Sequence, residues 1–135
     1  MKKRLLYLLC IGLLFSVPAC SVQKKQTEKI KDLRFHLVRE EEVPEELLDV
    51  IEEKGMEEFH LTYADQGNVY IARGYGEKEM TGYKVEVRAC YETLDAICIE
   101  TELLGPSKEE KVTDRRMNPY VVIKVKDIGK NIRFE

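Results

Sequence analysis

The chain has 135 residues, with 22 Lys and Arg against 25 Asp and Glu, four cysteines and no tryptophan. This length is sufficient for one small domain. Three of the basic residues, at positions 2–4, belong to an N-terminal targeting segment, and without them the formal net charge falls to about −6. Such an acidic chain lacks the basic face that phosphates require, so the composition excludes a nucleic-acid partner.

Residues 1–19 have the organisation of a lipoprotein signal peptide. The basic positions 2–4 precede the apolar run Leu5 to Val17, which is shorter than the roughly 20 residues of a membrane-spanning helix. The run ends in Val17-Pro18-Ala19-Cys20, which resembles the lipobox of bacterial lipoprotein precursors. We therefore expect a lipid on Cys20 and attachment to the outer face of the cell membrane, because two acyl chains anchor a protein stably. The alternative is an ordinary secretory signal with a chance cysteine.

Residues 20–32 are polar and without periodicity, which predicts a flexible tether after the lipidated cysteine. We expect a single domain over residues 33–135. Alternation of polar and apolar residues predicts a strand over 33–39. A helix is expected over 44–55, because Pro44 can open it, glutamates fill its first turn, and Lys54 and Gly55 can close it.

The remainder of the chain has the pattern of three β hairpins. Their strands are expected at residues 59–64 and 69–75, at 83–92 and 96–104, and at 120–126 and 131–134. Successive hairpins form an antiparallel sheet that must curl or stack to bury its apolar side. The prediction is a mainly β (α+β) fold, a small sandwich or partly open barrel with one packed helix.

The middle hairpin permits a prediction of register. Pairing Glu92 with Ala96 directs one apolar face inward and places Cys90 directly opposite Cys98. Outside the cytoplasm two facing cysteines are candidates for a disulfide, and a pair of free thiols is the alternative. Two cysteines without neighbouring histidines make an incomplete zinc site, so no metal and no other cofactor is expected.

The sequence offers no catalytic set of residues. After the signal segment the serines are Ser21, in the tether, and Ser107, in a loop, while His36 and His60 lie inside predicted strands. No serine elbow, HExxH motif or phosphate-binding glycine loop is present. Because no nucleophile, base and orienting group can be assigned, we expect a protein that is not an enzyme.

One segment favours recognition instead. Residues 74–87 read GYGEKEMTGYKVEV, in which glycines allow a tight loop between two strands and tyrosines are suited to interfaces. We predict a contact surface for a protein partner in this loop, formed by Tyr75, Gly76, Glu77, Thr81, Gly82 and Tyr83. The alternative is structural: the glycines shape the turn and the tyrosines pack at its ends.

The same segment carries a resemblance to a known family. The stretch VYIARGYGEKEMTGYKVEV at residues 69–87, Leu104-Gly105-Pro106, and the strand from Asn118 to Lys124 resemble the C-terminal domain of the PrcB family, over residues 68–125. Thr81 stands where members often have glycine. The family is named for a lipoprotein subunit that stabilises a cell-surface protease complex, so the resemblance implies an accessory, non-catalytic subunit whose partner is a protein such as a protease.

Two alternative functions remain open at this stage. Thr81-Gly82-Tyr83 is similar to a loop of chagasin-like cysteine-protease inhibitors, which suggests a protease inhibitor. A lipoprotein that binds a small ligand or cell-wall glycan is the other alternative; it requires an aromatic-lined groove, for which six tyrosines between Tyr63 and Tyr120 are available.

Overall fold

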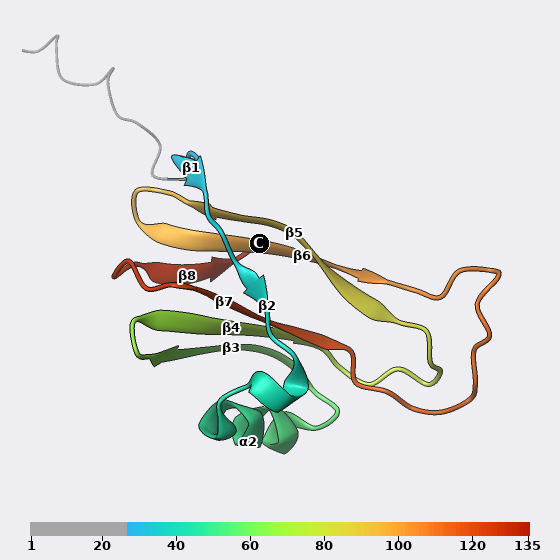
Figure 1. Cartoon of the computed structure of the whole chain (residues 1–135). Helices are drawn as coiled ribbons and strands as arrows, with labels where there is room; N and C mark the ends of the chain where they lie inside the picture. Colours follow the sequence, from blue (N-terminus) through green and yellow to red (C-terminus); the bar gives the residue numbers. More distant parts are fainter. Residues whose placement is uncertain (1–26) are drawn as a thin grey trace, which may run out of the picture.

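The computed structural model describes residues 27–135; the expected signal peptide and Cys20 lie outside this range. Two four-stranded β-sheets pack face to face, and one helix covers the outer face of one sheet (Figure 1). The sheets do not join into a closed barrel. This arrangement confirms the predicted class, a mainly β sandwich with a single packed α-helix among the described residues.

The first sheet has the strand order β1-β5-β6-β8 and the second has the order β2-β7-β4-β3. Every pairing is antiparallel except that of β6 with β8, which is parallel. The elements in chain order are β1 (Lys31–Asp32), β2 (His36–Leu37), the short 3-10 helix η1 (Glu40–Glu42), α2 (Glu45–Lys54), β3 (Glu58–Asp65), β4 (Asn68–Tyr75), β5 (Lys84–Glu92), β6 (Ala96–Leu104), β7 (Tyr120–Lys126) and β8 (Asn131–Phe134).

The main core lies between the two sheets. Alternate residues of each strand point inward, as a half-buried strand requires, and they are mostly β-branched. The buried members of this core are Val69, Ile71, Cys90, Ile97, Ile99, Ile123 and Val125.

A second, smaller core lies between α2 and the outer face of β3, β4 and β7. Leu47 and Ile51, one helical turn apart, pack there against Phe59, Ala72 and Val122. The helix ends at Lys54, and Gly55 follows with a positive φ of 55°, as the sequence predicts. The strands β4 and β7 therefore have apolar residues on both faces, which holds the sandwich and the helix in one unit.

The structure corrects the predicted strand over residues 33–39. Within that range only His36–Leu37 forms a strand, β2. β1 lies at Lys31–Asp32, where it pairs with β5 although the sequence predicts a tether over residues 20–32, and the chain crosses from the first sheet to the second between β1 and β2. Leu33 and Phe35 pack against the main core during this crossing. The apolar alternation is real, but it comes from a segment that closes one side of the sandwich.

The third predicted hairpin is wrong in its pairing, although both strands have the expected bounds. β7 pairs with β2 and β4 in the second sheet, whereas β8 pairs with β6 in the first. The segment 127–130 is thus a crossover between sheets. In its place beside β6, β8 packs Ile132 and Phe134 against the core between the sheets.

The register of the middle hairpin is correct only in its first half. Val85 pairs with Leu103 and Val87 with Thr101, but a bulge at Arg88 shifts the later pairs by one residue. Arg88 forms ion pairs with Glu86 and Glu102. A bulge changes which face successive side chains occupy.

Cys90 and Cys98 therefore do not face one another. Cys90 pairs with Ile99, and Cys98 with Tyr91. Cys90 lies in the core beside Ile97 and Ile99, whereas Cys98 points to the opposite face, where Arg133 Nη2 donates to its Sγ at 3.2 Å. Both cysteines are free, so the disulfide considered from the sequence is not formed. Burial raises the pKa of the Cys90 thiol to about 11, which keeps it protonated and unreactive.

Candidate partner-binding end

One end of the sandwich is built from two long connections, and we call it the loop end. Residues 76–83 join β4 to β5, and residues 105–119 join β6 to β7. Figure 1 shows the two connections side by side, away from the end that carries β1. β1 pairs with Glu92 and Tyr91, at the far end of β5, so the loop end lies opposite the point where the N-terminal part of the chain reaches the domain.

Hydrogen bonds hold the two connections together. Lys78 and Met117 form an isolated antiparallel bridge. The Lys78 nitrogen lies 2.8 Å from the Met117 carbonyl oxygen, and the Met117 nitrogen lies 3.0 Å from the Lys78 carbonyl oxygen. The Thr81 N–H donates to the Thr113 carbonyl at 3.1 Å, and the Thr113 N–H donates to the Thr81 hydroxyl at 3.0 Å. Arg116 adds an ion pair with Glu77 at 3.5 Å. The loop predicted to bind a partner is thus half of a larger, internally bonded surface.

Gly82 is required where the two connections touch. Its φ is 99°, a conformation that side chains rarely adopt. A Cβ on it would also lie 2.7 Å from the Cβ of Pro106 and 3.1 Å from a methyl carbon of Val112. The Thr81-Gly82 step therefore fits against residues 106–113.

The predicted contact residues have different positions. Tyr75 lies between the sheets: its hydroxyl is 2.6 Å from the Thr101 hydroxyl, and its ring is 3.9 Å from the Arg73 guanidinium carbon. Gly76 is buried, and Tyr83 is partly buried beside Gly105. Tyr75 thus joins the two sheets, as the structural alternative expects, while residues 77–83 remain at the surface in part.

Exposed apolar side chains that the sequence reasoning missed also lie at this end. Met80 projects from the first connection and Val112 from the second, and both are exposed. Met56 is exposed too, and its carbonyl accepts a hydrogen bond from the Glu77 N–H at 3.0 Å. Val112 is the one apolar residue within the charged run 108–116, which is the signal that could have indicated it. Methionine is an adaptable contact residue, suited to binding surfaces.

The charges around these apolar residues are mixed in sign. Residues 108–115 expose three basic and three acidic side chains: Lys108, Lys111, Arg115, Glu109, Glu110 and Asp114. A long, exposed connection of this kind within a compact fold is commonly functional. Because the signs balance, this surface produces little long-range electrostatic attraction.

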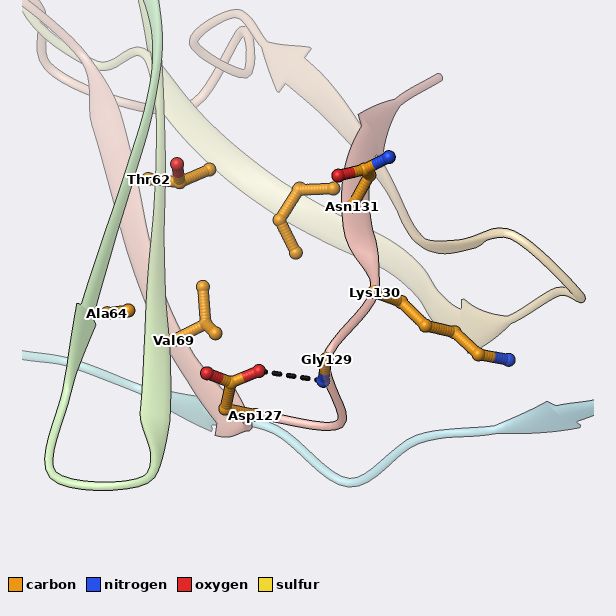
Figure 2. Close-up of a pocket in the computed structure, with 8 residues that line it drawn as sticks. Thr62, Ala64, Val69, Asp127, Gly129, Lys130 and Asn131 are labelled. Atoms are coloured by element: carbon orange, nitrogen blue, oxygen red, sulfur yellow. Dashed lines mark hydrogen bonds between the residues drawn. The ribbon is translucent and has the colours of Figure 1, made fainter.

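A cleft of about 570 Å³ lies at the opposite end, between the β3–β4 hairpin and β8 (Figure 2). It is lined by Thr62, Ala64, Val69, Asp127, Gly129, Lys130, Asn131 and Ile132. In residues 27–135, no three His, Cys, Asp or Glu side chains are grouped so that they could hold a metal ion. The cleft has neither a cation site nor an aromatic lining.

The tyrosines do not line a common groove. Tyr63, Tyr70 and Tyr120 pack against the helix-side core, Tyr75 lies between the sheets, and Tyr91 pairs with Cys98 on the other sheet. Tyr63 and Tyr70 share one face, with ring centroids 6.4 Å apart, but Tyr75 and Tyr91 lie elsewhere, so the six tyrosines do not form one aromatic platform.

His60 has the surroundings of a structural residue. Its ring stacks on Phe134, with centroids 4.3 Å apart and 7° between the planes. Burial, followed by the charge of Arg73, lowers its pKa. Together with Glu58, Arg73 and Phe59 it lines a small cavity of about 200 Å³, whose lining contains no serine, threonine or cysteine.

These features define a small β-sandwich with a composite loop end as its candidate binding surface. Residues 69–126 match the family model described as PrcB C-terminal, so this part of the chain is a PrcB C-terminal domain. The match extends from β4 to the end of β7 and includes both connections of the loop end. Comparison with curated proteins and with solved structures gave no match.

Proposed function

We propose that the protein is an extracytoplasmic, lipid-anchored lipoprotein that acts as a non-catalytic accessory subunit, which binds a protease at the loop end and stabilises it. The observation that carries the proposal is the PrcB C-terminal domain at residues 69–126, since the family is named for a lipoprotein subunit of a surface protease complex. The VPAC sequence ending in Cys20 supports the anchor.

The geometry of the loop end supports a binding role. Its two connections are fixed to one another through Lys78, Thr81 and Thr113, so a partner meets a surface that is already ordered. Pre-organisation reduces the entropy lost on association. Met80 and Val112 supply exposed apolar contacts, and the N-terminal segment joins the opposite end of the sandwich, which leaves the loop end free to face away from a membrane.

The inhibitor alternative receives less support from the geometry. An inhibitory loop must project into the cleft of a protease, whereas the Thr81 hydroxyl accepts a hydrogen bond from Thr113 and Gly82 packs against Pro106. Thr81-Gly82 is therefore part of the support of the loop end.

The test is a crosslinking pull-down from native membranes with the full-length protein. The double variant Met80→Asp/Val112→Asp places charges on the loop end, and Val50→Asp, at an exposed position of α2, is the matched control. We expect wild type and control to recover a protease and the double variant to lose it, with all three equally folded by circular dichroism.

The sign of the effect is then measured on the recovered protease. A longer lifetime of the protease in the presence of the wild-type protein agrees with a stabilising subunit, and a reduced turnover indicates an inhibitor. Recovery of glycan or lipid without a stoichiometric protein would transfer the assignment to a ligand-binding lipoprotein. Equal loss in the double variant and in Val50→Asp would remove the loop end as the contact surface.

A further inference from the structure

The end of the sandwich opposite the loop end carries a row of exposed aliphatic side chains. Ile30 is 50% exposed, Leu94 51% and Ile128 36%. Ile30 immediately precedes β1, Leu94 lies in the β5–β6 turn, and Ile128 lies in the crossover before β8. The sheet order is β1-β5-β6-β8, so the three residues cap successive tips of one sheet. Strands lie about 4.8 Å apart, which gives the row a length of roughly 15 Å.

Local hydrogen bonds fix the turns that present these side chains. Thr93 is fully buried, and its hydroxyl donates to Asp95 Oδ1 at 2.9 Å and accepts from the Ala96 N–H at 3.1 Å. Leu94 is therefore held at the tip of the turn. In the crossover, the Gly129 N–H donates to Asp127 Oδ1 at 2.9 Å (Figure 2). This bond joins the residues on either side of Ile128 and so orders the turn that carries it. The row is part of ordered turns.

The charges at this end are largely paired with one another. The Lys130 ammonium lies 2.6 Å from Glu92 Oε2 and donates to the Thr93 carbonyl at 2.6 Å. The hydrogen bond that Lys130 donates to Glu92 lowers the pKa of the Glu92 carboxyl. Arg133 pairs with Asp95 at 3.3 Å. Paired charges produce little field beyond the surface, so a partner of this end is selected by apolar contact and not by electrostatic attraction.

The path of the chain indicates what this partner is. Ile30 is only ten residues after Cys20, and ten residues span at most about 35 Å, whatever their conformation. A lipid on Cys20 therefore keeps the row within that distance of the bilayer surface. Aliphatic side chains at the tips of turns are suited to the boundary between headgroups and acyl chains.

We propose that Ile30, Leu94 and Ile128 form a docking edge that rests on the lipid bilayer, so that β5 and β6 stand away from the membrane and present the loop end outward. β5 has nine residues, a rise of about 30 Å. The proposal rests on the lipid anchor of the proposed function, and it assigns a defined orientation to a domain that a flexible tether alone would leave free to tumble.

The absence of tryptophan from the chain permits a direct test. Leu94→Trp and Ile128→Trp each place a single tryptophan on the docking edge, and Val112→Trp places one on the loop end as the control. Each full-length lipidated protein is reconstituted into phosphatidylcholine vesicles with and without brominated acyl chains. We expect a blue shift and quenching of the tryptophan at positions 94 and 128, and neither at 112, with no loss of quenching at high salt.

The outcomes separate the docking edge from the anchor. Mass spectrometry of the membrane-extracted protein reads the state of Cys20 first: an unmodified Cys20 overturns the anchor and the docking that depends on it. A lipidated Cys20 with equal quenching at positions 94, 128 and 112 overturns the docking edge alone. Loss of quenching at high salt contradicts the apolar basis of the contact. The pull-down of a protein partner does not depend on the tryptophan quenching or on the mass of Cys20, so it tests the binding role separately.

Discussion

At the scale of single residues, Gly82 shows how the candidate site depends on one backbone position. Its positive φ and its contact with Pro106 make two separate demands, and only glycine meets both. Gly67 also has a positive φ, of 82°, but a Cβ there meets nothing within 4 Å. The two glycines therefore separate the cost of backbone strain from the cost of the clash.

We predict that Gly82→Ala lowers the free energy of unfolding by about 2–3 kcal/mol, with strain and overpacking contributing together. Gly67→Ala should lower it by about 1 kcal/mol, from strain alone. Urea unfolding followed by circular dichroism measures both. If the two variants lose the same stability, the contact between the two connections is not tight.

Tyr75 illustrates the opposite outcome at this scale. The sequence pattern gave it the same standing as Tyr83, but its hydrogen bond to Thr101 and its contact with Arg73 place it inside the sandwich. A tyrosine with a partly buried ring and a bonded hydroxyl stabilises the fold, and the contact surface that we propose is therefore limited to residues 77–83 with Met56 and Val112.

At the scale of elements, helix α2 has one buried face and one exposed face. Leu47 is buried among Phe59, Ala72 and Val122, whereas Val50 is exposed on the same helix. We predict that Leu47→Ala lowers the free energy of unfolding by about 2–5 kcal/mol, because truncation leaves a cavity. Val50→Ala should change it by no more than about 0.5 kcal/mol.

Thermal and urea unfolding of the two variants provide the measurement. Helix propensities of leucine, valine and alanine differ by no more than about 0.7 kcal/mol, so helix propensity does not account for the difference. Similar losses in the two variants would show that α2 does not pack on β3, β4 and β7 as described.

At the scale of the whole molecule, the two ends of the sandwich have different surfaces, and we propose different roles for them. The docking edge consists of aliphatic tips among paired charges, and the loop end consists of two bonded connections with exposed Met80 and Val112. β5 and β6 extend between them. Within residues 27–135 no helix is long and apolar enough to cross a membrane.

We predict that Cys20→Ala abolishes lipid incorporation and changes the processing of the precursor, because the diacylglyceryl group has no other acceptor at that site. Cys10→Ala, which alters a cysteine inside the apolar run, is the matched control and should behave as wild type. Membrane fractionation and intact mass measure both effects. Unchanged retention and processing of Cys20→Ala would remove the anchor from the proposed function.

The sequence by itself determined the bounds of the later elements. Alternation and turn residues give β6, β7 and β8 the bounds that the structure shows, and proline, glutamates and glycine bracket α2. These signals are local, because each strand or helix sets its own periodicity. The PrcB C-terminal match at residues 69–126 also follows from sequence.

Only the tertiary structure decided which strands pair and which side chains meet. β8 joins β6 because this pairing places Ile132 and Phe134 against the core, and the bulge at Arg88 turns Cys90 and Cys98 to opposite faces. The contact of Thr81 with Thr113 joins residues 32 positions apart. Strand pairing and side-chain contacts depend on burial and hydrogen bonding over the whole molecule. The alternation of polar and apolar residues within one strand is the same whichever strand it pairs with.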